Sequence, residues 1–301
     1  MNPRQSPTAA PALQNSAGAP ATLHQYSSGY GYSAAGNQAN ALPPAPETGR
    51  RRGKSLYVAA GFVLPVFLLA AWFTVSALEL VPAFKLPSPE SVWTAATQLF
   101  ADGSLVKHIA ISTQRVLIGF AVGAVVGLVL GAAVGLSRWA SAFLAPTIGA
   151  FRAVPSLAWV PLLVLYVGIS EDSKVALIAI GALFPVYTTV AGALRHVDPQ
   201  LVELGQAYGL GRLSLLAQVQ LPAVVPSIVS GLRLALAQAW LFLVAAELIA
   251  SSMGLGFLLV DSQNNGRVDR MFLTIILLGI IGKTTDALIG LLEKYLLKRW
   301  G

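Results

Sequence analysis

The stretch ELGQAYGLGRLSLLAQVQLP, residues 203–222, interrupts a chain that is otherwise overwhelmingly apolar. It has helical spacing, two glycine breaks and a Leu-Pro pair at its end. Of the 301 residues, 55% are hydrophobic and only 11% are charged, whereas a soluble domain carries about a quarter charged residues. A soluble-looking pair of helices inside such a chain predicts a membrane protein with one structured loop in water.

Long apolar runs on both sides of this stretch predict membrane-spanning helices. A span needs roughly 20 apolar residues, because a helix rises about 1.5 Å per residue across a hydrocarbon core of about 30 Å. The runs lack the period-2 alternation of barrel strands, and a helix satisfies its own backbone polar groups in lipid. The predicted fold class is therefore all-α, a polytopic membrane protein of about six transmembrane helices, with spans at approximately 56–79, 111–136, 143–168, 174–194, 224–250 and 271–292.

The start of the chain differs in composition from the rest. Residues 1–49 are rich in Ala, Pro, Ser, Gly, Gln and Asn without apolar periodicity, which predicts a disordered tail. The membrane domain is predicted to cover 50–301. It opens with a basic cluster at 50–54, and the apolar run behind that cluster is too long for the core of a signal peptide, typically about 7–15 residues. We expect this run to remain in the membrane as the first span.

Lys and Arg near the span ends set the expected orientation. Cytoplasmic loops of membrane proteins carry an excess of these residues. If the N-terminus is cytoplasmic, most of them lie inside, and the outer side holds Lys85, Lys107, Lys174, Arg267 and Arg270. Both termini, the tail at 1–49 and the loop at 195–223 are therefore predicted to be cytoplasmic.

Composition and motifs exclude several classes of function. The net charge of +7 is spread between apolar runs, so no nucleic-acid partner is predicted. There is no cysteine, the three histidines lie far apart, and no carboxylate pair or Ser/His set suggests catalysis. The run GIIGKTTD at 279–286 is close to a P-loop, but Leu277 occupies the position of its required first glycine. We therefore expect no catalytic residue, no cofactor and no metal in this chain.

Local patterns predict how the helices pack. Glycine recurs at every fourth residue of the second span, which leaves one helix face nearly bare for close approach by a neighbour: Gly119, Gly123, Gly127, Gly131 and Gly135. Pro155 and Pro161 predict a kink in the third span. Before the second span, Ser88 and Pro89 are expected to begin a short surface helix with an apolar stripe of Val92, Ala95, Ala96 and Leu99.

Ionisable residues inside the spans need a partner or a wet cavity, because each costs at least about 2.5–3.5 kcal/mol at the bilayer centre. The candidates are Arg115, Arg152, Arg233, Glu247, Lys283 and Asp286. The last two lie on one helical face and are predicted to pair. The three arginines lie near predicted span ends and are interpreted as interfacial anchors, with Arg152 and Arg233 also candidates for lining the path of an anion. Glu247 has no local partner and either faces a pore or pairs between helices.

The opening stretch and the residues before it predict two short amphipathic helices joined by a glycine corner. Asp198 is a suitable N-cap and Pro199 a suitable first residue for the first helix, which has on one face Leu201, Leu204 and Tyr208. Gly209 and Gly211 break the helix, and a second short run is expected to end at Leu221-Pro222. The pair carries little positive charge for lying on a bilayer, so docking into a groove of a partner protein is favoured.

This stretch resembles the EAA loop of ABC-importer permeases, whose pattern is roughly Glu-Ala-Ala, three residues, Gly, nine residues and Ile-x-Leu-Pro. Glu203, Gly209 and Leu221-Pro222 match at the same spacing, Val219 stands for the isoleucine, and Leu204-Gly205 replace the two alanines. The resemblance covers about residues 84–301. Further motifs are similar to those of the sulfonate, taurine and nitrate branch, most of all the aliphatic sulfonate permeases: LPSP at 86–89, HIAISTQRVLIGF at 108–120, GLSRW at 135–139, VPSLAWVPLLVLYVGI at 154–169, LPAVVPSIVSGLRLAL at 221–236 and GKTTDALIGLLE at 282–293.

The resemblance implies a type I ABC-importer permease of the MetI-like fold in the bacterial inner membrane. It implies a permease homodimer, two copies of a cytoplasmic ATPase subunit and a periplasmic solute-binding protein. The EAA loop would couple the permease to the ATPase through Leu201, Glu203, Gly205, Tyr208, Gly209, Leu221 and Pro222. The expected substrate is an aliphatic sulfonate, with taurine or nitrate as the alternative.

A secondary transporter or channel is the alternative from another class and would need no such partners. Internal repeats or a relay of carboxylates would favour that alternative. The sequence has no obvious repeat and only isolated carboxylates within its spans.

Overall fold

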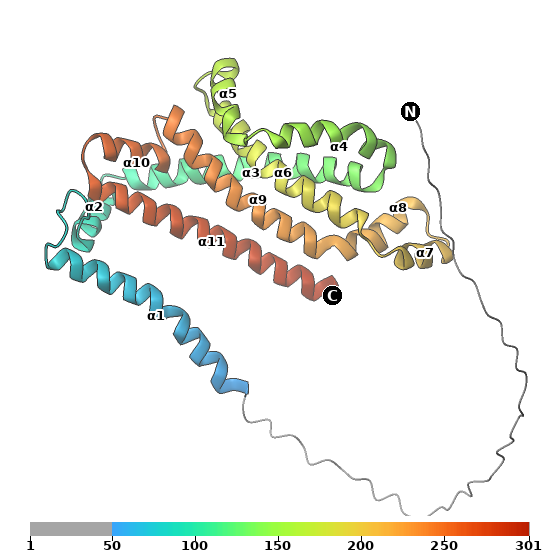
Figure 1. The fold of residues 1–301 in the computed structure, drawn as a ribbon, viewed down its shortest axis with the longest axis horizontal. Helices are drawn as coiled ribbons and strands as arrows, with labels where there is room; N and C mark the ends of the chain where they lie inside the picture. Colours follow the sequence, from blue (N-terminus) through green and yellow to red (C-terminus); the bar gives the residue numbers. More distant parts are fainter. Residues whose placement is uncertain (1–49, 301) are drawn as a thin grey trace, which may run out of the picture. The chain divides into compact units, whose positions relative to one another are not determined.

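Long helices dominate the structure, as the apolar runs predict (Figure 1). The computed structural model describes residues 50–300, with side chains described for 61–249, 251–295 and 298, and this part of the chain contains no strand. The helices are α1 (Arg50–Ala77), α2 (Pro89–Ala101), α3 (Ser104–Leu136), α4 (Arg138–Ala153), η1 (Ser156–Ala158), α5 (Trp159–Val167), α6 (Glu171–Arg195), α7 (Pro199–Ala207), α8 (Arg212–Leu215), η2 (Leu216–Gln220), α9 (Leu221–Ala250), α10 (Leu255–Asn264) and α11 (Val268–Trp300). The predicted disordered tail, 1–49, lies outside the described residues.

Helix α6 forms the centre of the compact unit that begins at Tyr57, because it packs against both α3 and α9. The side chains between these helices are fully buried, among them Val116 of α3, Ile178 of α6 and Leu243 of α9. Helix α11 packs against α9 on the other side. The core is therefore a bundle of long helices.

The glycines of α3 form the contact with α6. A Cβ atom at Gly119 would lie 2.6 Å from the Cβ of Ile178, and one at Gly131 would lie 2.9 Å from the Cβ of Val190. At Gly127 it would lie 2.7 Å from the carbonyl oxygen of Leu183. The close packing predicted from the glycine spacing is confirmed. The register increases along both helices together, so α3 and α6 run parallel, with helix backbones in contact along one face.

The third predicted span is broken instead of continuous. Helix α4 ends at Ala153, and the next helical segment, from Ser156 to Val167, is bent from it by 79°. Pro155 stands at the break: it has no N–H to continue the helix, and Val154 before it is extended (φ −73°, ψ 126°). Pro161 lies in the first turn of α5 and causes no break. The predicted kink is thus present at the first of the two prolines.

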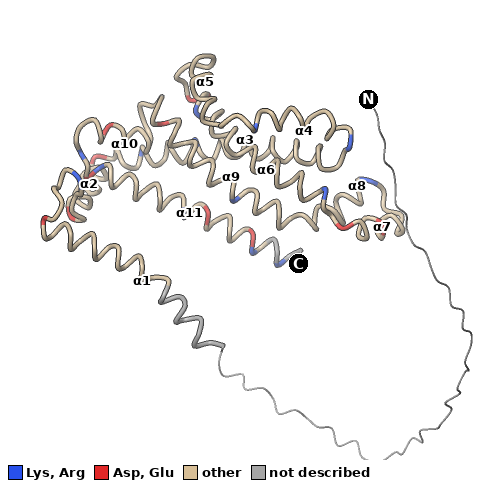
Figure 2. The backbone as a smooth tube through the Cα atoms, in the orientation of Figure 1, with Lys and Arg blue, Asp and Glu red and all other residues tan. Residues whose placement is uncertain are grey.

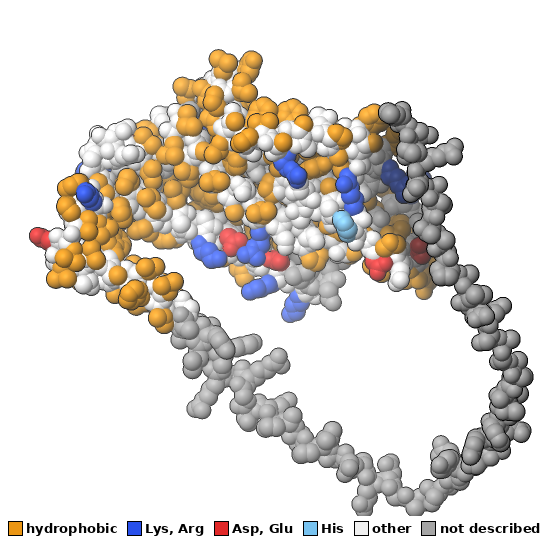
Figure 3. All heavy atoms as spheres, viewed as in Figure 1, with side chains coloured by type: hydrophobic (Ala, Val, Ile, Leu, Met, Phe, Trp, Pro, Cys, Tyr) orange, Lys and Arg blue, Asp and Glu red, His pale blue; other side chains and the backbone are white. Residues whose placement is uncertain are grey.

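The described residues contain four helices that are long and apolar enough to cross a membrane, or five if the bent pair forms one span. These four contain the predicted spans 111–136, 174–194, 224–250 and 271–292. The first predicted span coincides with α1, whose described apolar part, Gly61–Ala77, is shorter than the others. Exposed hydrophobic side chains cover much of the molecular face in Figure 3, as expected for helices in contact with lipid.

The short surface helix is α2. The hydroxyl of Ser88 accepts a hydrogen bond from the amide of Ser91 at 3.1 Å, and Pro89 is the first residue of the helix. The predicted apolar stripe is buried at Val92, Ala95 and Leu99, with Ala96 packed against the same cluster. This cluster ties α2 to α11.

Replacement of Gly127 by alanine should destabilise the protein by about 1–3 kcal/mol, because the added Cβ meets a backbone carbonyl of α6 that cannot move independently of its helix. The matched control is Gly149→Ala in α4, where an added Cβ meets nothing within 4 Å. Thermal unfolding in detergent measures both effects. Equal stability of the two variants would contradict close packing of α3 on α6.

Candidate functional site

The predicted corner between two short helices is present as α7 and α8. The side chain of Asp198 accepts a hydrogen bond from the amide of Gln200 at 2.9 Å, and Pro199 follows as the first helical residue. Helix α7 ends at Ala207, and Gly209 adopts φ +75°. This left-handed conformation favours glycine and turns the chain toward α8.

Gly205 lies inside the corner. It is buried, and a Cβ atom there would be 2.5 Å from Cδ1 of Leu215 in α8. Leu215 is itself buried. Gly205 therefore provides the room in which the side chain of Leu215 packs against α7.

The second helix of the corner does not end at Leu221-Pro222, contrary to the prediction. Helix α8 continues through a π-helical turn, η2, into α9. Together they form one apolar helix, Arg212–Ile249, that is long enough to cross a membrane. The amide of Leu221 donates to the carbonyl of Leu216, five residues back. Pro222 lies at the start of α9, where the absence of its N–H is tolerated. The corner is thus joined to a membrane helix without a flexible linker.

The outer side of the corner presents apolar side chains that nothing in the described chain covers. Tyr208 is 80% exposed and Leu213 is 82% exposed. Leu201 and Leu204 of α7 are exposed as well, and so is Glu203. The sequence indicated the apolar face of α7, and the structure adds Leu213 from α8. An exposed apolar ridge of this kind fits a groove on another protein.

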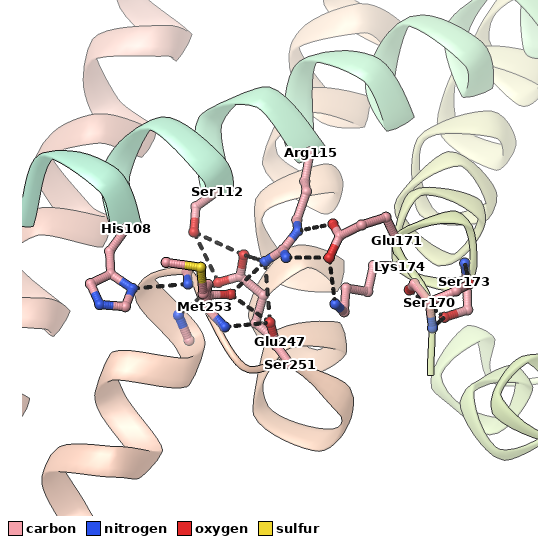
Figure 4. Close-up of polar contacts among 12 residues, drawn as sticks. His108, Ser112, Arg115, Ser170, Glu171, Ser173, Lys174, Glu247, Ser251 and Met253 are labelled. Carbon is pink, nitrogen blue, oxygen red and sulfur yellow. Dashed lines mark hydrogen bonds and ion pairs between the residues drawn. The ribbon is translucent and has the colours of Figure 1, made fainter. Parts of the chain in front are cut away.

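An ionic network joins α3, α6 and α9, and lies at the first turn of α6 and the last turn of α9 (Figure 4). Arg115 of α3 donates from Nη1 to Oε1 of Glu247 in α9 at 2.7 Å. It also donates from Nε and Nη2 to the two carboxylate oxygens of Glu171 in α6, at 2.6 and 2.7 Å. Lys174 donates to Glu171 at 2.8 Å. Two cations and two carboxylates therefore balance, as burial of charge requires.

Backbone amides complete the surroundings of Glu247. The amide of Gly256 donates to its Oε2 at 2.8 Å, and the hydroxyl of Ser112 lies 2.9 Å from both of its carboxylate oxygens. Ser112 also accepts from the amide of Leu255 at 2.8 Å, and His108 accepts from the amide of Gly254 at 3.0 Å. The turn between α9 and α10 thus donates hydrogen bonds both to the buried carboxylate of Glu247 and to two side chains of α3.

The network changes the interpretation of two predicted residues. Arg115 is buried and paired, so its interpretation as an interfacial anchor is wrong; its partners come from helices too distant in sequence to be recognised. Of the two alternatives for Glu247, a pore-facing position or a pair between helices, the structure shows the pair between helices. Glu171, Ser112 and His108 also belong to this network, although the sequence did not predict them as partners. Their only signal was their place near the ends of apolar runs.

The network borders a cavity of about 320 Å³ that opens to the surface. The side chain of Glu171 is 62% exposed, although Arg115 and Lys174 behind it are buried. The remaining lining is largely apolar: Ile111, Gln114, Ile118, Val175, Ser252 and Met253.

Arg233 and Arg152 differ in their surroundings. Arg233 of α9 donates to Asp286 at 3.0 and 3.1 Å and to Glu293 at 3.0 Å, which joins α9 to α11. The predicted pair of Lys283 with Asp286 is present at 3.3 Å. Arg152, near the end of α4, is exposed and has no ion-pair partner among the described side chains. The charged positions of α9 and α11 can be followed in Figure 2.

Comparison with known proteins yields one family and several relatives. Residues 123–298 match the family described as the inner membrane component of binding-protein-dependent transport systems. A permease protein of Escherichia coli strain K12, named SsuC for aliphatic sulfonates transport, is 42% identical over 82% of this chain and 94% of its own. Its namesake in Bacillus subtilis strain 168 is 37% identical over 79% and 86%. The E. coli taurine transport permease TauC is 34% identical over 71% and 80%.

The fold is also found among solved structures. A chain from inward-facing structures of the MetNI methionine ABC transporter superposes with a TM-score of 0.56 at 20% identity, and the match covers 65% of this chain and 96% of that one. This likeness concerns the arrangement of the helices.

Replacement of Arg115 by glutamine should destabilise the protein by about 3–5 kcal/mol, because it leaves the fully buried Glu247 without its cation. The second replacement Glu247→Gln should recover much of that loss, since a neutral amide needs no ion pair. Unfolding in detergent of wild type, both single variants and the double variant gives the coupling free energy. Simple additivity of the two single effects would contradict the paired arrangement.

Proposed function

Because the chain belongs to the family of inner membrane components of binding-protein-dependent transport systems, we propose that it forms the transmembrane pathway of an ATP-driven importer. The chain performs no chemistry in this proposal. Its energy comes from ATP hydrolysed by a separate cytoplasmic ATPase subunit, present in two copies. A periplasmic solute-binding protein delivers the substrate on the other side of the membrane.

The corner of α7 and α8 is the part proposed to contact the ATPase. Its exposed apolar side chains, of which Tyr208 and Leu213 are the most exposed, suit a groove on a partner protein. Because α8 runs into α9 without a break, a displacement of the corner is carried into a membrane helix. The residues proposed to couple the two subunits are Leu201, Glu203, Gly205, Tyr208, Gly209, Leu221 and Pro222.

A second copy of the permease is part of the proposal. Arg233 is 40% exposed and its partner Asp286 is 31% exposed, although both belong to apolar helices. Charged side chains that face lipid are costly, so this face of α9 and α11 suits contact with a second copy or with a water-filled pathway. The excess of Lys and Arg on one side favours cytoplasmic termini.

The proposed substrate is an aliphatic sulfonate. This proposal is supported by the names of the relatives in E. coli and B. subtilis, and by the motifs GLSRW at 135–139 and GKTTDALIGLLE at 282–293. Taurine, which also carries a sulfonate group, is the alternative that TauC supports, and nitrate is the alternative that rests on the sequence resemblance alone. Of the proposed pathway residues, Arg233 and Glu247 are already paired within the chain, whereas Arg152 is exposed. Arg152 is therefore the strongest candidate for attracting an anion.

The substitution Gly209→Arg should give a folded, membrane-inserted chain that no longer couples transport to ATP hydrolysis. No described residue lies within 4 Å of a Cβ at this position, so the added side chain projects outward into the proposed ATPase groove. The measurement is co-purification with the candidate cytoplasmic ATPase subunit, followed by ATPase activity in proteoliposomes.

The matched control for this substitution is Gly103→Arg at the start of α3. Gly103 has φ +73°, against +75° for Gly209, and is equally open, so both variants carry the same backbone strain. Gly103→Arg should retain the complex and its activity. Normal uptake by Gly209→Arg, or equal loss in both variants, would exclude the corner as the coupling element. Uptake without any ATPase would favour a secondary transporter.

The substrate proposal predicts that the ATPase activity of the reconstituted complex rises when the binding protein carries an alkanesulfonate. Because the loaded binding protein signals through the permease, the binding protein without ligand should stimulate less. Stimulation by taurine or nitrate alone would keep the importer and reject the sulfonate. The Arg152→Gln variant should reduce uptake of the anion without changing the amount of complex.

A further inference from the structure

A basic cavity lies where α3 ends, α4 begins and α6 ends. Its volume is about 420 Å³. Its polar lining consists of two arginines and two serines: Arg138, Arg195, Ser137 and Ser141. The remaining lining residues are Val134, Gly135, Leu136 and Leu194. Figure 2 shows basic positions both at the turn between α3 and α4 and at the end of α6. Neither arginine takes part in the corner or in the ionic network.

The two arginines of this cavity differ from the paired arginines elsewhere in the chain. Arg115, Arg233 and Arg267 each form an ion pair with a carboxylate. Arg138 and Arg195 have no carboxylate within ion-pair distance among the described side chains, and both are exposed. Arg195 reaches across from α6 to α4, where its Nη2 donates to the hydroxyl of Ser141 at 2.6 Å. Two uncompensated guanidinium groups thus face one cavity.

The cavity lies at the ends of two helices that are long and apolar enough to cross a membrane, which is where lipid headgroups meet such helices. Helices α3 and α6 run parallel and both reach their ends here, at Leu136 and Arg195. Trp139, directly after Arg138, is 76% exposed, and the ring of Phe143 one helical turn later stacks on its indole at 6.3 Å between centroids. Exposed aromatic side chains next to basic residues at the end of a span are typical of the membrane interface.

We propose that this cavity binds the phosphate group of an anionic phospholipid. The guanidinium groups of Arg138 and Arg195 would hold the phosphate, because arginine matches its oxygens in a planar, bidentate geometry. The apolar side chains of α4 beside the cavity, Phe143 and Trp139, would contact the acyl chains. A lipid is favoured over an acidic segment of a partner protein because these aromatic side chains face outward next to the arginines.

The binding measurement uses the full-length protein in neutral detergent and native mass spectrometry. Phosphatidylglycerol and phosphatidylcholine with identical acyl chains are titrated separately. Wild type should bind phosphatidylglycerol more tightly. The double variant Arg138→Gln/Arg195→Gln should bind it about thirtyfold more weakly, since each basic residue near an anionic lipid contributes a factor of about five.

Two controls isolate the geometry of the cavity. Lys107→Gln removes one exposed cation near the start of α3, outside the cavity, and should leave lipid binding unchanged. Arg138→Lys/Arg195→Lys keeps both charges and should bind with intermediate affinity, because lysine lacks the planar fork. Since both arginines are exposed, the variants should elute as wild type on size exclusion, which separates lost binding from lost folding.

Three results would overturn the proposal. The first is equal binding of the two lipids by wild type, or retained phosphatidylglycerol binding in the double variant. The second is displacement of the lipid by an equal concentration of glycerol 3-phosphate, which would identify a soluble phosphate ester as the ligand. The third is a double variant that keeps lipid binding but loses the ATPase subunit, which would assign the cavity to a partner protein.

Discussion

The parallel contact between α3 and α6 is the constraint on which the other features depend. Five glycines at four-residue intervals let the two backbones touch, and a Cβ at any of them would overlap α6. Because lipid supplies no hydrophobic force between helices, this close van der Waals contact takes the place of an apolar core driven by water. It also fixes the relative height of the two helices. The ends of the two helices therefore meet, at Leu136 and Arg195, whereas α3 begins about two turns before the level at which α6 starts.

At one end of this pair the chain buries charge, and at the other end it exposes charge. Arg115 of α3 meets Glu171 at the start of α6, and the last turn of α9 adds Glu247. At the far end, Arg138 and Arg195 lie beside one cavity without carboxylate partners among the described side chains. The balanced network holds helices together, whereas the unbalanced end is free to attract an anion. The difference follows from which side chains the parallel register brings together.

The corner of α7 and α8 is joined directly to this bundle. Its apolar side chains are exposed, and its second helix continues into α9 without a linker. Arg233 then joins α9 to α11 through Asp286 and Glu293. A push on the corner has a continuous mechanical path: along α9, and through its ion pairs to α11. This is the physical content of the proposed coupling.

Local chemistry in the sequence determined the helices, the close packing at the glycines, the cap at Asp198, the break at Pro155 and the family resemblance, because each depends on neighbouring residues or on helical spacing. The sequence did not determine the pairing of Arg115 with Glu247 or of Arg233 with Asp286, since their separations of 132 and 53 residues carry no local signal. It also placed a stop at Leu221-Pro222, where the structure has a π-helical turn instead. Only the tertiary structure decided these points, because a charge in an apolar helix must find its partner on whichever helix the packing brings near.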